Sequence, residues 1–234
     1  MKSNIALKSH LTIAALMLFL AGNVAMAAPR DPNRSIARAG GSYQSQNYGE
    51  WSAEWWQLMY SIPVVNGQHP LLSGGAVTNG NGDLFLVADP SGTATINVTV
   101  PNSTPIFVPI VNAECSTIEP DPFHGDTETE MRACANGHID QTSGLSATID
   151  AVPVTDLLSY RTQSPMFEFT LPENNVLEFQ GITAPAGTTA QAVDAGVYLL
   201  IKPLSRGTTH TIRVQGTFDE FGTTIDTTFR ITVQ

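Results

Sequence analysis

The sequence predicts a mainly β fold, an antiparallel β-sandwich or jelly roll with one helix packed against it. About eight strand-like runs follow residue 83 at short spacing, and the turns between them are rich in glycine, asparagine and proline. Ahead of these runs, residues 47–61 form a helix-like stretch that holds all three tryptophans of the chain. So much apolar bulk on one helix beside so many strands indicates that the β fold buries that helix.

The helix-like stretch has a recognisable start and an apolar majority. Asn47 followed three positions later by Glu50 is the pattern of an N-terminal capping box. At 100° per residue, the apolar side chains cover roughly 220° of the helix circumference. We therefore expect a helix packed into the fold, with Trp51 and Trp55 buried and Trp56 partly exposed at the edge of the apolar arc.

The strands are predicted from the alternation of apolar and polar residues. In the last run Phe229, Ile231 and Val233 alternate with polar residues, as expected of a strand with one buried face. The predicted strands cover residues 84–88, 94–100, 106–111, 145–152, 166–171, 197–202, 209–218 and 224–233. Residues 112–144 interrupt the series, and we expect a loop there with a short helix at 126–135.

Residues 1–27 have the form of a signal peptide for export. A positively charged N-terminal region precedes an apolar run, and Ala25-Met26-Ala27 is an A-x-A cleavage site. The apolar run is too short to cross a bilayer comfortably, which disfavours a membrane anchor. We expect a secreted or periplasmic protein with no membrane insertion after the signal is removed.

Beyond the signal, the sequence divides into an arm and a domain. Residues 28–46 are polar and lack periodicity, so we expect a flexible N-terminal arm. Residues 47–234 are predicted to form a single β-sandwich domain that includes the packed helix, because no composition shift divides them.

The chain is acidic, with 21 Asp and Glu residues against 11 Lys and Arg and a formal net charge of −10 at pH 7. Such a balance argues against binding to nucleic acid and against docking on anionic lipid. A cation or a neutral polymer such as a glycan remains compatible with this charge, and we expect a partner of that kind.

Both cysteines, Cys115 and Cys134, lie in the interruption between the strands. In an exported protein an isolated pair of cysteines is most simply a disulfide. Closing a loop of this length stabilises the fold by about 3 kcal/mol in the chain-entropy model. A catalytic thiol is the alternative, but no Cys/His signature surrounds either residue.

The same interruption suggests a metal site. His124 and Asp126 are spaced like His138 and Asp140, and further acids surround the first pair. Oxygen ligands on a loop suit a divalent cation such as calcium, whereas two histidines with carboxylates suit zinc or copper. A solvated acidic loop without any metal is the alternative interpretation.

Enzymatic motifs are scarce in the sequence. It lacks G-x-S-x-G, H-E-x-x-H, paired C-x-x-C and glycine-rich phosphate-loop motifs. Glu50 and Glu54, one helical turn apart, are a carboxylate pair of the kind that glycoside hydrolysis uses, although such pairs are commonly only solubilising. Trp56 and Tyr60, at the edge of the apolar arc, are candidates to line a ligand groove together with Glu54.

Several segments together carry a resemblance to known proteins. In chain order they are YGEWSAEWWQ, IFVPIVNAECST, MRACA, YRTQSPMFEFTLPENN and residues 197–212. They resemble a family of exported bacterial proteins of uncharacterised function over nearly the whole chain after the signal. The resemblance implies a bacterial secreted or periplasmic location and supports pairing of Cys115 with Cys134. It implies no activity and transfers no catalytic residue.

The sequence thus favours a non-catalytic binding or envelope-associated protein that recognises a glycan or another extracellular ligand. One alternative is a secreted polysaccharide hydrolase or lyase that uses carboxylates, and another is a metal-binding extracellular protein. An enzyme requires two titratable groups in a cleft with shifted pKa values, whereas a binding protein requires only a groove with aromatic walls.

Overall fold

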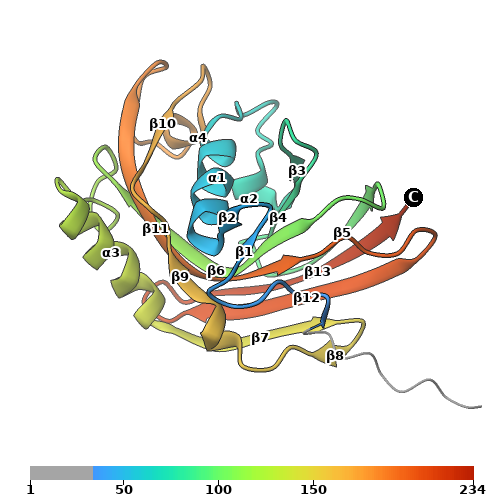
Figure 1. The fold of residues 1–234 in the computed structure, drawn as a ribbon. Helices are drawn as coiled ribbons and strands as arrows, with labels where there is room; N and C mark the ends of the chain where they lie inside the picture. Colours follow the sequence, from blue (N-terminus) through green and yellow to red (C-terminus); the bar gives the residue numbers. More distant parts are fainter. Residues whose placement is uncertain (1–33) are drawn as a thin grey trace, which may run out of the picture.

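The computed structural model describes residues 34–234. The predicted signal peptide, residues 1–27, lies outside the described residues, as does the first part of the predicted arm. The described chain is mainly β, as the sequence predicts, and several helices are inserted between the strands (Figure 1).

The elements run in the following order along the chain. The helices are α1 (Tyr48–Tyr60), α2 (Pro70–Ser73), α3 (Glu128–Asp140) and α4 (Val176–Phe179), and a 3-10 turn, η2, spans Leu157–Tyr160. The strands are β1 (Ser42–Tyr43), β2 (Gln46–Asn47), β3 (Gly75–Thr78), β4 (Leu84–Val87), β5 (Thr93–Val100), β6 (Ile106–Ser116), β7 (Thr142–Ile149), β8 (Val152–Pro153), β9 (Arg161–Gln163), β10 (Phe167–Thr170), β11 (Thr189–Ile201), β12 (Thr209–Phe218) and β13 (Thr223–Val233).

The strands form two large sheets and the small β1–β2 hairpin. The first sheet has the order β10-β11-β6-β4-β3, with β9 also paired to β11, and the second has the order β5-β13-β12-β7-β8. Most neighbours are antiparallel, but β4 pairs with β6 and β5 pairs with β13 in parallel. The two sheets are therefore mixed rather than purely antiparallel.

Two central strands are longer than predicted. β6 continues through Asn112 to Ser116, where the sequence predicts a loop, and β11 begins at Thr189 rather than at Val197. Most residues of both strands are buried whichever face they lie on. A strand buried on both faces does not show the alternation on which the prediction relies, so its limits are hidden in the sequence.

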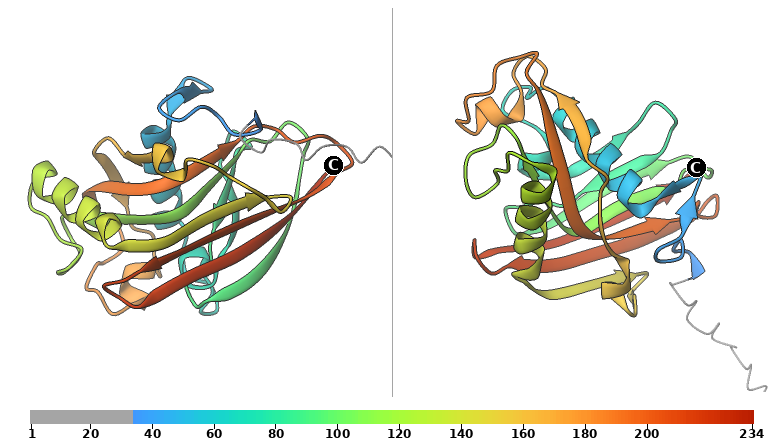
Figure 2. Two further views of the ribbon diagram at one scale, coloured as in Figure 1. Left: turned by 90° about the horizontal axis from the view of Figure 1, so that it is seen from below. Right: turned by 60° about the vertical axis from the view of Figure 1, so that its left-hand side comes forward.

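The two sheets share one hydrophobic core, which includes residues of β6 and β12. A Cβ atom placed on Gly216 of β12 would lie only 2.6 Å from Val111 of β6. Glycine at this position therefore permits close contact between the sheets, which Figure 2 shows from two further directions.

α1 begins as predicted, with Asn47 as its N-cap. The Asn47 side chain accepts hydrogen bonds from the backbone N–H groups of Gly49 (2.9 Å) and Glu50 (3.1 Å). The Glu50 carboxylate in turn accepts from the Asn47 N–H at 2.7 Å, which completes the predicted capping box. A Cβ on Gly49 would lie 2.3 Å from the carbonyl oxygen of Gln163, so glycine is needed where the helix approaches β9.

α1 lies in the hollow of the curved first sheet, with β10 and β11 on one side and β3 and β4 on the other (Figure 1). Trp51 stacks on Phe107 of β6 with 6.0 Å between ring centroids. The indole N–H of Trp55 donates to the carbonyl oxygen of Leu86 at 3.0 Å. Trp51 and Trp55 are 0% and 2% exposed, whereas Trp56 is partly exposed, and both observations confirm the prediction.

The described part of the predicted arm, residues 34–46, is packed against the first sheet rather than flexible. Ile36 and Ala37 are buried, Ile36 bridges to Ile201, and the Ala37 N–H donates to the Leu200 carbonyl oxygen at 2.7 Å. The expectation of a flexible arm is corrected here, because two apolar residues in a polar stretch are enough to anchor the chain along β11.

Cys115 and Cys134 form a disulfide, as predicted. The bond joins the end of β6 to α3, the helix that the sequence predicts at residues 126–135. α3 has its own capping box, in which the Thr127 side chain accepts from the Glu130 N–H and the Glu130 carboxylate accepts from the Thr127 N–H. The loop between β6 and α3 is therefore fixed at both ends.

Replacing Cys134 with serine is expected to lower the free energy of unfolding by about 3 kcal/mol. The bridge joins residues 19 positions apart, and its loss frees that loop in the unfolded chain. Urea denaturation of the wild type and of Cys134→Ser measures the difference, with the reduced wild type as a control that should lose a similar amount. Equal unfolding free energies for the oxidised and reduced wild type would show that the bridge contributes nothing.

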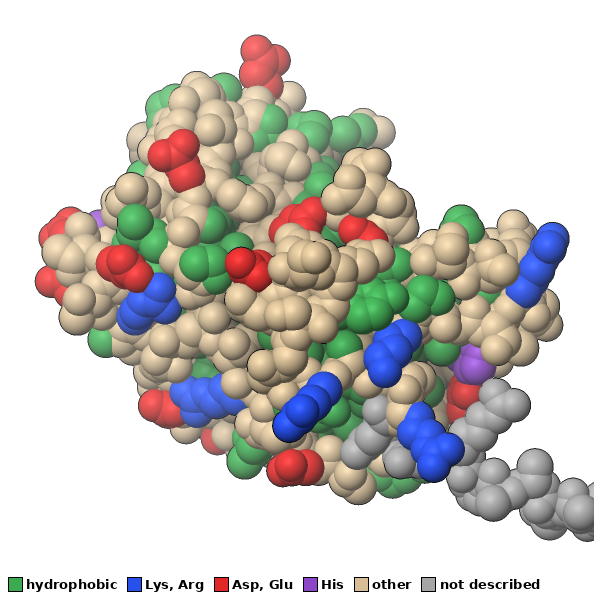
Figure 3. Space-filling view, in the orientation of Figure 1, with side chains coloured by type: hydrophobic (Ala, Val, Ile, Leu, Met, Phe, Trp, Pro, Cys, Tyr) green, Lys and Arg blue, Asp and Glu red, His purple; other side chains and the backbone are tan. Residues whose placement is uncertain are grey.

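Charged side chains are dispersed over the face seen in Figure 3. Acidic side chains are visible over α1 and β10 at the top, and the Lys and Arg side chains lower down stand apart from one another. Nucleic-acid binding uses clustered basic side chains, which this face does not present. None of the helices described between residues 34 and 234 combines the length and the apolar composition that spanning a bilayer requires.

Candidate functional site

A cavity of about 440 Å³ lies where the end of α1 meets the second half of β6. Its walls come from α1, α2, β6, the loop after β6, the α4 segment and the turn between β12 and β13. The lining residues are Trp56, Tyr60, Leu71, Asn112, Ala113, Glu114, Glu119, Phe123, Leu177, Gln180, Ile182, Phe218, Phe221 and Thr223. Most of the wall is aromatic or aliphatic, and a few polar groups are set into it, which is the usual composition of a small-molecule site.

The cavity lies at an open edge of the first sheet. β6 pairs with β11 along its length, but it pairs with β4 only at Ile106 and Phe107. Ala113 and Glu114 are consecutive and so point to opposite faces of β6, yet both line the cavity. A cavity in contact with both faces must lie beside the unpaired edge of the strand.

Backbone groups of Glu114 face this edge. Glu114 is opposite Asp194 in the β6–β11 ladder. On the other side of β11 the Asp194 C=O accepts from the Ser164 N–H at 2.9 Å, and the Asp194 N–H donates to the Ser164 hydroxyl at 2.8 Å. Glu114 and Asp194 are therefore a non-hydrogen-bonded pair, whose N–H and C=O groups point away from each other. The backbone N–H and C=O of Glu114 are consequently directed to the cavity side of β6.

Glu114 is a buried carboxyl group in the cavity wall, only 3% exposed. Its Oε1 accepts a hydrogen bond from the Tyr60 hydroxyl, and its Oε2 has no hydrogen-bond partner among the described residues. Burial raises the pKa of Glu114 well above its usual range, and the nearby carboxyl of Glu119 raises it further. Burial therefore favours the protonated, neutral form of Glu114.

Glu119, in the loop after β6, lies close enough to Glu114 to raise its pKa. The Ser116 hydroxyl donates to Glu119 Oε2 at 2.8 Å and thereby holds the side chain on this side of the loop. The nearby Glu119 carboxyl disfavours ionisation of Glu114.

Asp194 lies behind the cavity wall and is 0% exposed. Its Oδ1 accepts from the indole N–H of Trp56 at 2.8 Å and from the Tyr198 hydroxyl at 2.6 Å. Burial raises the pKa of Asp194 to about 7, although the hydrogen bonds from Tyr198 and Trp56 oppose this rise. Asp194 does not line the cavity, but its bond to Trp56 fixes that ring at the cavity wall.

The structure places two of the three predicted ligand-binding residues, Trp56 and Tyr60, in the cavity wall. Tyr60 is stacked between Trp56 at 5.5 Å and Phe169 at 4.3 Å, so neither face of its ring is free. Tyr60 therefore acts on the cavity through its hydroxyl, which holds Glu114, and not as a flat aromatic surface.

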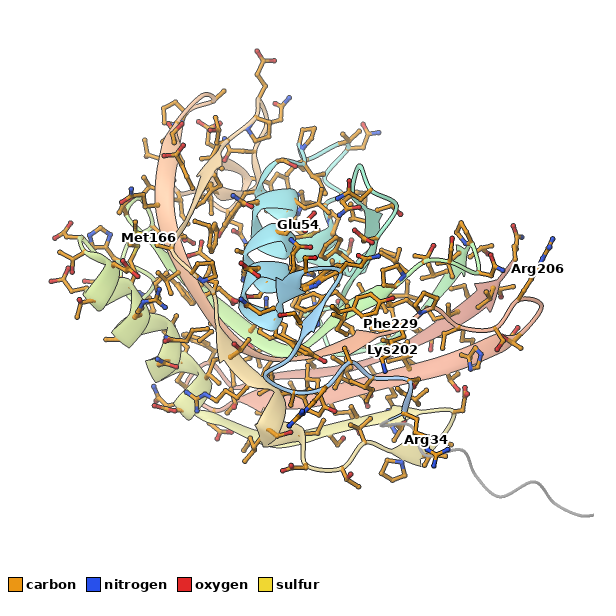
Figure 4. All side chains as sticks on the ribbon, viewed as in Figure 1. Arg34, Glu54, Met166, Lys202, Arg206 and Phe229 are labelled. Carbon is orange, nitrogen blue, oxygen red and sulfur yellow. A yellow bond between two sulfur atoms is a disulfide. The ribbon has the colours of Figure 1, made fainter. Side chains whose placement is uncertain are left out.

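Glu54, the third predicted ligand-binding residue, is not among the residues that line the cavity. It lies on the flank of α1 (Figure 4) and accepts hydrogen bonds from the side chains of Asn79 at 2.6 Å and Gln46 at 3.2 Å. Glu50 has its carboxylate on the helix N-cap. The predicted pair of Glu50 and Glu54 is thus engaged in two separate structural contacts.

The structure does not bring the four predicted metal ligands together. Three separate pairs are seen: His124 with Asp126 at 3.1 Å, His138 with Glu220, and Asp140 with Arg161 at 2.7 Å. An Arg side chain on a carboxylate competes with a cation for the same oxygens. Metal binding by the His124–Asp126 pair stays a prediction.

One group of potential metal ligands is close together in the described part of the chain, namely Cys115, Cys134 and His138. A metal would need the two sulfurs as thiolates, but they are joined in the disulfide. This group therefore offers one imidazole and no thiolate while the bridge is intact.

A second hollow of about 510 Å³ adjoins the cavity, since Glu119 and Ile182 line both. Asp121 and His124, from the acidic loop, belong to its wall. The hydrogen bond that the His124 ring donates to the Asp126 carboxylate raises the pKa of His124 above its usual value. The approach to Glu119 is therefore lined by further acidic and imidazole groups.

Sequence reasoning does not single out Glu114, which lies in the cavity wall, or Asp194, which lies behind it. The signal is present in the sequence, because each is the single acid within a long, otherwise mostly apolar strand. Burying a carboxylate in a strand costs a large free energy unless hydrogen-bond donors pair with it or it is protonated. A lone acid of this kind therefore marks a position where a partner must be found.

Comparisons of the chain with protein-family models, with curated proteins and with solved structures give no match.

Proposed function

We propose that this protein is an exported binding protein whose cavity beside β6 takes a small organic ligand with an apolar body and a polar head. Aromatic and aliphatic residues form most of the cavity wall, and Glu114, Glu119 and Asn112 are among its few polar residues. We also propose that the two sheets form a β-sandwich, which supplies a rigid frame, and that the protein is secreted or periplasmic. The disulfide supports export, because such bonds persist in oxidising compartments.

One observation carries this proposal. The two buried side-chain atoms without hydrogen-bond partners among the described residues are Glu114 Oε2 and Asn112 Nδ2, and both residues line the cavity. Buried polar atoms without partners are rare in folded proteins, and each indicates a missing proton, water or ligand. A polar ligand head at this position would supply hydrogen bonds to both.

A ligand screen tests the proposal. We expect small amines, alcohols, amides and sugars to include molecules that raise the melting temperature, since a ligand at about 100 times its Kd stabilises the folded state by about 2.7 kcal/mol. Binding should also change the fluorescence of Trp56, which lines the cavity, more than that of the buried Trp51 and Trp55. Gln180→Trp, an exposed position in the cavity wall, should block binding without unfolding the protein.

The matched control is Glu168→Gln, an exposed acid on β10 that does not line the cavity. It should leave every binding signal unchanged. The proposal is contradicted if no member of the screen binds, or if the molecules that bind do so equally well to Gln180→Trp.

A hydrolase that uses carboxyl groups is the second candidate. Glu114 and Glu119 put a neutral carboxyl beside a second carboxyl in one cavity. A glycosidase needs both of its carboxyl groups in contact with the sugar or the attacking water. Glu114 is only 3% exposed and accepts a hydrogen bond from the Tyr60 hydroxyl, so the geometry favours binding over glycoside hydrolysis.

Release of reducing sugar from soluble polysaccharides distinguishes the candidates. We expect no release by the wild type above the level of Glu119→Gln. Turnover that Glu119→Gln abolishes, with the fold intact, would establish the hydrolase instead.

A further inference from the structure

We infer that this cavity selects a small primary amine in its charged form, with the ammonium group held by Glu114 and Glu119 and the apolar part among the aromatic residues. The inference rests on the proposed function and adds the chemical class of the ligand. It follows from the charge, the hydrogen-bonding groups and the wall of the cavity.

The charge of the wall has one sign. Glu114 and Glu119 are acidic, and none of the described residues that line the cavity is Lys, Arg or His. The adjoining hollow adds Asp121 and also His124, whose ring donates to the Asp126 carboxylate. An anionic head would be repelled here, and a neutral head would leave the carboxyl pair uncompensated, whereas a cation is attracted by both carboxyl groups.

The hydrogen-bonding groups match an ammonium ion. A primary ammonium carries three N–H donors and no acceptor. Three acceptors belong to residues of the cavity wall: Glu114 Oε2, which is buried and has no partner among the described residues, the Glu119 carboxylate, and the backbone C=O of Glu114 on the open edge of β6. A ligand hydroxyl has a single donor and would satisfy one of these three acceptors.

The rest of the wall suits an apolar body next to that cation. Phe123, Phe218 and Phe221 line the cavity together with Trp56. Aromatic rings favour a nearby cation through their electron-rich faces as well as through burial of apolar surface. Trp56 is held in place from behind by its bond to Asp194, so the ring is positioned before a ligand arrives.

Binding of the cation displaces the proton of Glu114. In the free protein burial favours the protonated form of Glu114, and in the complex the ammonium group compensates its carboxylate while the proton passes to solvent. The groups that face Glu114 are Tyr60 from α1, Glu119 from the loop and Asp194 from β11. Burial raises the pKa of Tyr60, so its hydroxyl keeps its proton and continues to donate to Glu114 in both states.

The sign of the pH dependence follows from this exchange. Because the complex holds fewer protons than the free protein, amine binding should become tighter as the pH rises from about 6 to 9. The increase should end near pH 10, where a primary amine itself loses its proton. A neutral ligand of the same shape displaces no proton, so its affinity should not rise with pH.

Two probes of matched shape test the inference, namely 2-phenylethylamine and 2-phenylethanol. Isothermal titration of the purified protein with each probe, at pH 6 and pH 8.5 and in two buffers of different ionisation heat, gives the affinities and the protons released. We expect the amine to bind about 10- to 100-fold more tightly than the alcohol at pH 8.5, the range of a charge-assisted hydrogen bond, with release of a proton.

Variants locate the effect. Glu119→Gln should weaken amine binding roughly tenfold and leave alcohol binding nearly unchanged, and Glu114→Gln should remove the proton release. Glu168→Gln, which removes one exposed negative charge elsewhere, should change neither probe. Glu119 is only partly buried, so this variant should fold even if Glu114→Gln does not.

Three outcomes would overturn the inference. Equal affinity for amine and alcohol leaves the proposed binding function in place but removes the preference for a cation. Amine binding that survives in both Glu119→Gln and Glu114→Gln lies at another site. Binding of neither probe removes the amine class, while the broader screen with Gln180→Trp still decides whether the cavity binds a ligand.

Discussion

Replacing Trp51 with alanine is expected to lower the free energy of unfolding by about 3–5 kcal/mol. Trp51 is fully buried, stacks on Phe107 and contacts Phe85 with 5.7 Å between ring centroids. Its removal leaves a cavity between α1 and the first sheet and also removes the indole hydrogen bond to the Tyr43 carbonyl oxygen. A loss of this size is a large share of the 5–15 kcal/mol typical of a folded domain.

Urea denaturation of the wild type and of Trp51→Ala measures this loss. Phe179→Ala is the control, because Phe179 is 57% exposed and its removal should cost less than about 1 kcal/mol. Trp56→Ala should lie between the two, since Trp56 is partly exposed but bonds to Asp194. If Trp51→Ala were as stable as Phe179→Ala, α1 would not be part of the core.

Replacing Asp194 with asparagine is expected to remove a pH dependence of stability between about pH 4 and pH 7. Burial raises the pKa of Asp194 to about 7 from its usual value near 4. In this window the folded state keeps a proton that the unfolded state releases, so the free energy of unfolding falls as the pH rises. Three pKa units correspond to a loss on the order of 4 kcal/mol between the ends of the window.

Asparagine keeps the hydrogen bonds at this position but has no proton to lose. Its carbonyl oxygen can accept from Trp56 and its amide can donate to the Tyr198 hydroxyl. Unfolding free energies of Asp194→Asn and of the wild type at pH 4.5, 6 and 7.5 should therefore diverge in favour of the variant as the pH rises. Parallel curves for the two proteins would mean that Asp194 does not titrate in this window.

A matched comparison separates Asp194 from the neighbouring carboxyl. Glu114 also has a raised pKa, so it contributes its own fall in stability with rising pH. Glu114→Gln should remove that part and also abolish the proton release expected on amine binding, whereas Asp194→Asn should leave the proton release intact because Asp194 does not line the cavity. The two carboxyl groups are thus distinguished by a binding readout that a purely structural role would not change.

The sequence by itself determined the parts of this protein that depend on local chemistry. The capping pattern of Asn47 and Glu50 fixed the start of α1, and the width of its apolar arc fixed which tryptophans are buried. The alternation of apolar and polar residues predicted strands of the second sheet accurately. For example, β12 coincides with the strand predicted at residues 209–218. The pairing of Cys115 with Cys134 followed from there being no other cysteine to choose.

Only the tertiary structure decided where the site lies. Glu114 and Asp194 are 80 positions apart in the sequence, and the register of β6 against β11 makes them direct neighbours. The same pairing leaves one edge of β6 open, and residues from α1, α4 and the β12–β13 turn close the cavity around it. Local patterns report which face of an element is buried, but not which distant element covers it. The pKa and the role of a buried carboxyl group depend on which distant element covers it.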